Sequence, residues 1–151
     1  MFDPVEYPNL KAAGYKPTSA KTHKYNCIAW AAGDNRRWWS YSIGYYWPPG
    51  VPRANTVEAY IKAFGTLGYV ECVDAECANP PYEPEVSRIA LYALMGVPKH
   101  AARQVDAQMW TSKMGQNIDL EHTLRALEGP SYGTVCKILK KEIVPAKTGE
   151  N

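Results

Sequence analysis

Two residues of this chain, Cys27 and His100, have the chemistry of a nucleophile and its general base. Cys27 lies at the start of a short apolar segment, residues 25–33, which predicts a helix that ends at Gly33. The N–H groups and the dipole at such a helix start favour the reactive thiolate. His100 opens an apparent strand at residues 99–105. We therefore expect the fold to bring the thiol and the imidazole together. The alternative is that Cys27 is a small apolar core residue.

A general base of this kind needs a partner on its second ring nitrogen. The register of the hairpin around Asp106 decides which side chains of the next strand share the face of His100. One register selects Thr111 and Lys113, and a shift by one residue selects Ser112 instead. The candidates for the partner are Ser112 and Asp119, which rank equally, followed by Glu121.

Further residues would complete a site of this kind. The oxyanion needs the N–H of Cys27 and a second donor, for which the candidates are Asn26 and a group from the N-terminal arm. The aromatic loop at residues 38–47 either lines a groove for peptide or sugar rings or packs on the domain, and we expect packing for most of its side chains. The expected substrate-binding residues are Trp47, Arg103 and Trp110.

These side chains need a scaffold, and the length predicts one domain over residues 1–151. We expect an irregular arm at residues 1–22 and a frayed tail at residues 145–151. The clearest element is a helix over residues 55–68, with Asn55 as its N-cap and an apolar stripe on one side.

The rest of the chain predicts an antiparallel sheet with helices beside it. A second helix is expected at residues 119–127, and residues 133–141 fit either a short helix or an edge strand. The expected strands are residues 69–73, and then residues 87–94, 99–105 and 108–114, which form a meander.

Composition excludes several classes of protein. The chain has 17 Lys and Arg and 15 Asp and Glu residues, a net charge of +2, so no nucleic-acid partner is expected. No apolar run approaches the ~20 residues that span a bilayer, so no membrane partner is expected. Residues 1–16 lack the basic start and apolar block of a signal peptide. We expect a cytoplasmic protein with free cysteines, unless a dedicated system exports it, and we expect no cofactor and no metal.

Two resemblances add to this interpretation. Residues 26–31 (NCIAWA) and 97–103 (VPKHAAR) resemble the Cys helix and His strand of papain-like cysteine hydrolases of the NlpC and CHAP types. Together with residues 47–53 (WPPGVPR) and 110–115 (WTSKMG), most of the chain also resembles an uncharacterised bacterial domain family.

The first resemblance implies an α+β papain-like fold, in which an N-terminal Cys-bearing helix packs on an antiparallel sheet that carries the His. It also implies a thiol hydrolase or acyl transferase that acts on an amide or ester bond, with peptide or cell-wall peptide as the substrate class. NlpC-type enzymes usually carry Asp-Cys-Ser-Gly where residues 26–29 read Asn-Cys-Ile-Ala. A toxin or effector delivered to another cell would suit such an enzyme. The alternative function is a non-catalytic binding domain that holds a protein partner with the loop at residues 38–47.

Overall fold

The computed structural model describes residues 2–73 and 78–143. Its helices are short, and most of the regular structure is strand. In chain order the elements are α1 (Pro8–Ala13), β1 (Lys16–Pro17), α2 (Cys27–Ala31), α3 (Val57–Gly65), β2 (Val70–Glu71), β3 (Val86–Leu94), β4 (Val97–Gln104), β5 (Met109–Lys113), β6 (Asp119–Thr123), the 3-10 helix η2 (Leu124–Leu127) and β7 (Thr134–Glu142).

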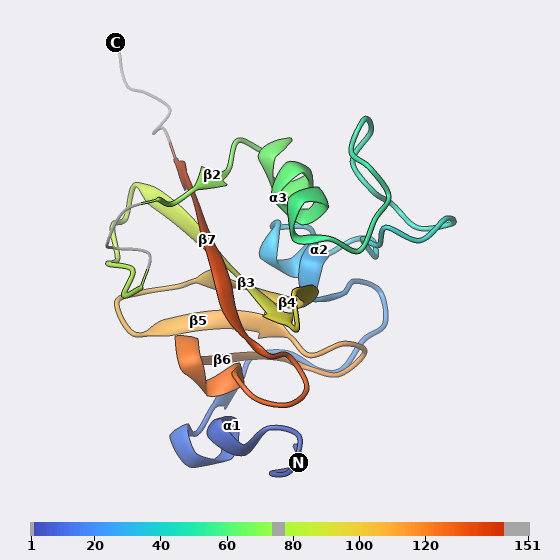
Figure 1. Ribbon diagram of the computed structural model, residues 1–151. Helices are drawn as coiled ribbons and strands as arrows, with labels where there is room; N and C mark the ends of the chain where they lie inside the picture. Colours follow the sequence, from blue (N-terminus) through green and yellow to red (C-terminus); the bar gives the residue numbers. More distant parts are fainter. Residues whose placement is uncertain (1, 74–77, 144–151) are drawn as a thin grey trace.

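The strands form one seven-stranded sheet in the order β1-β6-β5-β4-β3-β7-β2 (Figure 1). Every pair of neighbouring strands is antiparallel. The expected α+β papain-like fold is therefore wrong, because a single antiparallel sheet dominates and the α-helices have only six, five and nine residues. None of the helices in the described residues has the length and apolarity needed to cross a membrane.

The sheet is covered on both faces, and β3 shows this most clearly because four successive residues, Ile89 to Tyr92, are fully buried. Ile89 and Leu91 belong to a first core cluster with residues of α2 and α3. Ala90 and Tyr92 belong to a second cluster with Leu10 of α1 and residues of η2. Alternating side chains of a strand point to opposite faces, so α2 and α3 cover one face while α1 and η2 cover the other (Figure 1).

Several expected elements are confirmed with other bounds. The helix that carries Cys27 is present as Cys27–Ala31, and the helix expected at residues 55–68 is Val57–Gly65. The N-cap of the latter is Thr56, whose side chain accepts the N–H of Ala59, so the assignment of the cap to Asn55 is wrong. The arm at residues 1–22 is not wholly irregular, since it contains α1 and β1.

The helix expected at residues 119–127 is wrong. Residues 119–123 form β6, which pairs with β5, and only residues 124–127 make a turn of 3-10 helix. Leu120, Leu124 and Leu127 fit a helical period, but Leu120 and His122 also alternate and are both fully buried. The pairing of residues 119–123 with β5 makes this segment a strand rather than a helix. The segment expected at residues 133–141 as a short helix or an edge strand is the strand β7 (Thr134–Glu142), which lies inside the sheet between β3 and β2.

The cysteines do not all match the expectation of free thiols. Cys27 and Cys136 are free, whereas Cys72 is disulfide-bonded, so the expectation is wrong for Cys72. Cys77 and the tail expected at residues 145–151 lie outside the described residues.

Two irregularities flank Tyr92 and set which way its neighbours face. Between β3 and β4, Tyr92 pairs with His100 but Ala93 pairs with Pro98, so Lys99 is the extra residue of a bulge. Between β3 and β7, the register shifts at the same level, between Leu91 and Tyr92. The bulge leaves His100 opposite Tyr92, on the face of the second cluster.

Gly133, which precedes β7, is required by its conformation and by its surroundings. Its φ is 75°, and a Cβ placed there would lie 1.9 Å from the carbonyl oxygen of Ala93. We predict that Gly133→Ala lowers the free energy of unfolding by more than about 2 kcal/mol, because backbone on both sides must move. Chemical denaturation measures this.

The matched control is Gly65→Ala, at the end of α3, where a Cβ would meet nothing within 4 Å. This substitution should leave the stability unchanged or raise it by up to about 1 kcal/mol. Equal stabilities of the two variants would contradict the close approach of Gly133 to Ala93.

Candidate functional site

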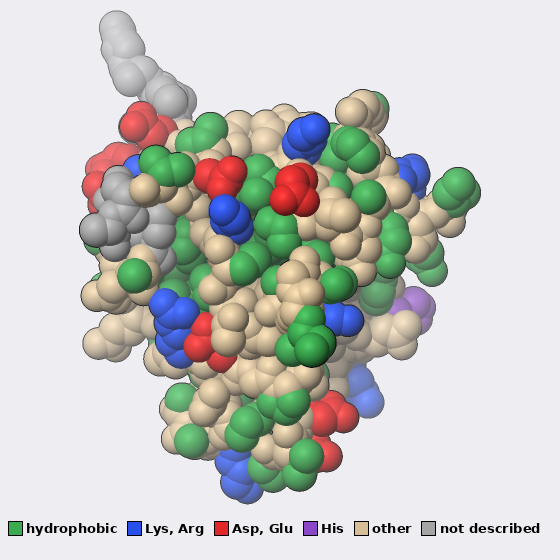
Figure 2. All heavy atoms as spheres, in the orientation of Figure 1, with side chains coloured by type: hydrophobic (Ala, Val, Ile, Leu, Met, Phe, Trp, Pro, Cys, Tyr) green, Lys and Arg blue, Asp and Glu red, His purple; other side chains and the backbone are tan. Residues whose placement is uncertain are grey.

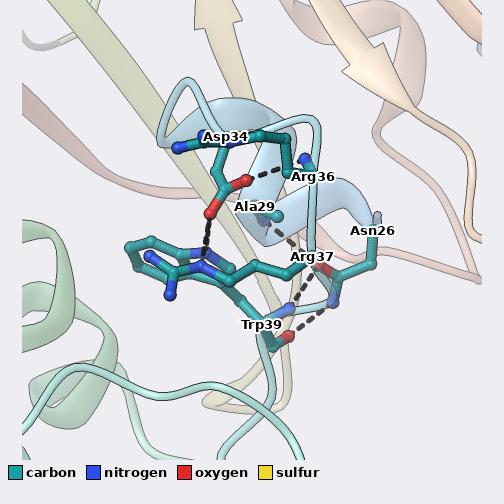
Figure 3. Close-up of polar contacts among 6 residues, drawn as sticks. All are labelled: Asn26, Ala29, Asp34, Arg36, Arg37 and Trp39. Carbon is teal, nitrogen blue, oxygen red and sulfur yellow. Dashed lines mark hydrogen bonds and ion pairs between the residues drawn. The ribbon is translucent and has the colours of Figure 1, made fainter. Parts of the chain in front are cut away.

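The start of α2 is fixed by its N-cap, Asn26. The Asn26 Oδ1 accepts the N–H of Ala29 at 3.1 Å and the N–H of Trp39 at 3.1 Å, and the Nδ2 donates to the carbonyl oxygen of Trp39 at 2.6 Å. Figure 3 shows these bonds together with the bond from the Trp39 indole to Asp34. Asn26 therefore ties the following loop to the helix start, and its amide nitrogen is already bonded to Trp39.

Cys27 lies where β4 and β5 separate. These strands pair only at Arg103↔Thr111 and Gln104↔Trp110, although β4 begins at Val97 and β5 continues to Lys113. If this register continued, Ala101 would face Lys113. The two strands separate there, and the N–H of Ala101 is close enough to the Cys27 sulfur to lower the pKa of the thiol. The helix α2 lies beside this point, since the indole of Trp30 donates to the hydroxyl of Thr111. We call the place where β4 and β5 separate the β4–β5 opening.

Two opposing effects act on the pKa of the Cys27 thiol. Burial raises the pKa of Cys27 to about 11, although hydrogen bonds from the N–H groups of Ala101, Ile28 and Cys27 and the charge of Lys113 act to lower it. Burial raises the pKa of Tyr60, in the first cluster, and of Tyr132, beside the second, and the charge of a Cys27 thiolate adds to both shifts. The sulfur is thus within electrostatic range of groups from both faces of the sheet.

His100 is held in a buried relay with Ser112 and His122. The Nε2 of His100 lies 2.9 Å from the Oγ of Ser112, which lies 2.7 Å from the Nε2 of His122. The Nδ1 of His122 lies 2.7 Å from the carbonyl oxygen of Thr123. All three side chains of the relay are fully buried.

The relay determines the tautomer of each ring. A carbonyl only accepts, so the Nδ1 of His122 carries the proton and its Nε2 accepts the hydroxyl of Ser112. The Ser112 oxygen then accepts from the Nε2–H of His100. This leaves the Nδ1 of His100 as an unprotonated acceptor, and it has no hydrogen-bond partner although it is buried.

Both imidazoles are held neutral. Burial lowers the pKa of His100 well below 6.5, and His122 adds to this effect. Burial also lowers the pKa of His122 to about 4. The ring of Tyr132 stacks on the His100 ring, with their centres 4.2 Å apart and an angle of 7° between their planes.

The expected pair of Cys27 and His100 is only partly assembled. No hydrogen bond joins them, because the Nδ1 of His100 has no partner and its Nε2 is bonded to Ser112. α2 packs on the first cluster, whereas His100 faces the second with Tyr92. The sulfur nevertheless contacts the backbone of Ala101, the residue that follows His100.

The structure distinguishes among the three candidates for the partner of His100. Ser112 bonds to His100, as one of the two registers predicted, while Lys113 points to the other face. Asp119 lies with Tyr25, whose hydroxyl donates to its Oδ2 at 2.6 Å, and Asp119 makes no contact with His100 among the described hydrogen bonds. Glu121 pairs with Lys16 and with Thr111 across the sheet.

The expected substrate-binding residues do not gather into one groove. Trp47 is buried in the first cluster, where its indole donates to the carbonyl of Pro52, and Trp110 is buried in the second. Arg103 lies over the ring of Trp30 on α2, 5.8 Å from its centre. Of the three, only Arg103 lies beside the helix that carries Cys27.

Two residues of the site, His122 and Tyr132, were not singled out from the sequence, and Lys113 was named only as a side chain that one hairpin register would place on the face of His100. His122 belonged to the helix expected at residues 119–127, yet it is fully buried in β6. The alternation of Leu120 and His122 is the one signal that could have placed it on a buried strand face. Lys113 is also fully buried, and nothing in a single lysine indicates that.

The comparisons with known proteins identify a family but no function. Residues 16–140 match the family described as "Domain of unknown function (DUF7689)", and the chain belongs to that family. No curated protein and no solved structure matches the chain.

The buried relay predicts loss of stability in acid. An unfolded histidine titrates near 6.5, while folded His100 and His122 titrate lower, so the unfolded chain binds more protons between these values. The stabilisation is complete above about pH 6.5 and is lost as the pH falls toward 4, by roughly 1.4 kcal/mol per pH unit for each histidine. Urea unfolding at a series of pH values measures this.

His122→Gln should give a shallower slope than the wild type in this window, because one titrating group is removed. His23→Gln, which changes an exposed loop residue, is the matched control. A slope that His122→Gln leaves unchanged would contradict the proposed neutral relay.

Proposed function

We propose that this chain is a thiol-dependent hydrolase or acyl transferase that acts on an amide or ester bond, with Cys27 as nucleophile and His100 as general base. One observation carries the proposal. Among the described residues, the Nδ1 of His100 is buried and has no hydrogen-bond partner, and the next residue is Ala101, whose N–H is close enough to the Cys27 sulfur to lower the pKa of the thiol. An orphaned buried acceptor costs about 1–3 kcal/mol, and such groups are found preferentially at functional sites.

The chemistry follows from the two protonation states. Burial keeps the thiol and the imidazole neutral at rest, so the pair is not a standing thiolate–imidazolium ion pair. Instead, the Nδ1 of His100 takes the thiol proton as the sulfur attacks the carbonyl carbon. Ser112 accepts from the Nε2–H and so stabilises the imidazolium that forms.

The second half of the reaction returns the proton. The Nδ1–H of His100 protonates the departing amine or alcohol as the carbonyl-to-leaving-group bond breaks, which leaves an acyl group on Cys27. Water or an amine then attacks the thioester, with the same nitrogen as base. The donors near the sulfur are the backbone N–H groups of Cys27 and Ala101, since the Asn26 amide is bonded to Trp39.

Access to the pair requires a movement of Tyr132. His100 is fully buried, and the Tyr132 ring lies directly on it. Tyr132 follows η2 in the segment that leads to β7, so a shift of this segment would open His100 to the β4–β5 opening. Charges of both signs are interspersed on the face in Figure 2, which is compatible with a peptide-like substrate of no fixed charge.

A second candidate function, a binding domain, is favoured by the loop at residues 38–47. The side chain of Ile43 is 90% exposed and that of Tyr45 is 50% exposed, although the loop is held firmly. The guanidinium of Arg53 donates to four of its carbonyl oxygens, those of Ser40, Tyr41, Ser42 and Tyr45. A rigid loop that projects beside α2 (Figure 1) would present these two side chains to a partner.

Alkylation of the thiol separates the two functions. In a Cys136→Ser background, which removes the exposed free thiol, iodoacetamide should modify Cys27 at neutral pH. We predict that His100→Gln slows this modification by roughly ten-fold or more, because the base that removes the thiol proton is lost. Mass spectrometry of the intact protein measures the rate.

His23→Gln, in the exposed loop before α2, is the matched control and should label at the wild-type rate. A rate that His100→Gln leaves unchanged, in a variant that still unfolds cooperatively, would contradict the proposed base and would favour the binding domain.

A further inference from the structure

We infer that Lys113 is a positioning residue for the nucleophile: its buried ammonium stabilises the thiolate of Cys27 across the β4–β5 opening, and Asp119 moderates that effect. The inference rests on the proposed function, since it takes Cys27 as the nucleophile. It adds a second group that acts on the sulfur, from the face of the sheet opposite to His100.

The ammonium of Lys113 is buried without a carboxylate bonded to it. The side chain is fully buried, and its Nζ donates to the carbonyl oxygens of Thr22, at 2.6 Å, and of Gly115. It also lies over the ring of Tyr25, 5.3 Å from the ring centre. Carbonyl and ring dipoles solvate a cation but leave its net charge uncompensated. A buried charge is costly unless it is paired, so its retention here calls for a function.

The strand register places Lys113 beside the thiol. Continued from Arg103↔Thr111, the pairing of β4 and β5 would set Ala101 opposite Lys113. That pairing is absent, and the N–H of Ala101 is instead close enough to the Cys27 sulfur to lower the pKa of the thiol. The Nζ of Lys113 lies against the residues that lead into α2, since it donates to the carbonyl oxygen of Thr22 and lies over the ring of Tyr25, two residues before Cys27. Lys113 acts to lower the pKa of Cys27, and Cys27 acts to raise that of Lys113.

Asp119 is the nearest carboxylate on the same face, because it pairs directly with Lys113 between β5 and β6. Its Oδ2 accepts the hydroxyl of Tyr25, and its Oδ1 is buried with no hydrogen-bond partner. Asp119 therefore acts on Lys113 through space, and it raises the pKa of the ammonium against the lowering caused by burial. The other titratable groups within electrostatic range of the thiol are Tyr60 and Tyr132, and the ring of Tyr25 lies against Lys113.

A purely structural role for Lys113 is the competing explanation. Its two carbonyl bonds connect Thr22, before α2, to Gly115, after β5, and this would stabilise the fold without acting on the sulfur. The two explanations differ in one readout, the pH dependence of the reaction at Cys27. A structural tie changes stability but does not move that dependence.

The test is the pH–rate profile of alkylation at Cys27 in the Cys136→Ser background, with iodoacetamide as the probe. Lys113→Met removes the charge and keeps the length of the side chain, so the midpoint of the profile should rise by about one pH unit or more. Lys113→Arg keeps the charge and should restore the midpoint toward the wild type. The matched control is Lys137→Met, which removes a lysine of β7 that pairs with Glu71 of β2. This substitution should leave the midpoint unchanged.

If Lys113→Met fails to fold, Asp119→Asn tests the same inference, with an expected shift of the midpoint in the opposite direction. It removes the negative charge that opposes the ammonium, so the midpoint should fall. The inference is overturned if neither variant moves the midpoint, or if both move it in the same direction. If the midpoint is unmoved while His100→Gln still slows the labelling, only the role of Lys113 fails. If Cys27 of the folded chain resists labelling at every pH, both proposals fail.

Discussion

The site depends on the approach of the Cys27 sulfur to the N–H of Ala101, where β4 separates from β5. In an unbroken antiparallel sheet that N–H would be bonded to β5. Here the strands pair at two positions only, and α2 lies beside them, with the indole of Trp30 bonded to Thr111 of β5. The thiol is within electrostatic range of Tyr60 in the first cluster and of Tyr132 beside the second.

Several polar groups around the opening are buried at a cost in stability. The Nδ1 of His100 and the Oδ1 of Asp119 have no hydrogen-bond partner, and the ammonium of Lys113 is satisfied by carbonyl groups alone. Buried polar groups are normally paired, and exceptions concentrate where chemistry needs them. The three groups lie on neighbouring strands, with His100 of β4 on the face of the second cluster and Lys113 of β5 and Asp119 of β6 on the face of the first. This concentration on three strands, rather than any single group, distinguishes the site from an ordinary core.

Much of the scaffold could be predicted from local patterns, because those patterns have one physical meaning. The apolar run from Ile89 to Tyr92 marks a strand covered on both faces, and the stripe in α3 marks an amphipathic helix. Residues 119–123 were misassigned because Leu120 satisfies two periods at once. The choice between them is made by pairing with β5, a contact that no local window contains.

The facing of His100 could not be predicted for a related reason. A two-residue turn would pair Gln104 with Met109, but β4 and β5 pair as Gln104↔Trp110, and a shift of one residue moves every side chain to the other face. The bulge at Lys99 changes the alternation of β4 just before His100. The simplest turn would place Lys113 on the face of His100 and Ser112 on the other face. In the structure Ser112 bonds to His100, and Lys113 lies on the opposite face. The papain-like fold was expected from the order of a Cys helix and a His strand, but that order is compatible with a sheet of a different kind.

The central claim is that the Nδ1 of His100 is an unprotonated base, held in that state by Ser112 and His122, which takes the proton of the Cys27 thiol. Long-range ¹⁵N–¹H correlation spectra of the imidazoles at neutral pH test it most directly, with His100→Gln used to assign the ring. The account predicts a protonated Nε2 and a bare Nδ1 in His100, and a shift of the Nδ1 resonance when Cys27 is alkylated. A ring protonated at Nδ1, or an Nδ1 resonance that alkylation leaves unchanged, would contradict it.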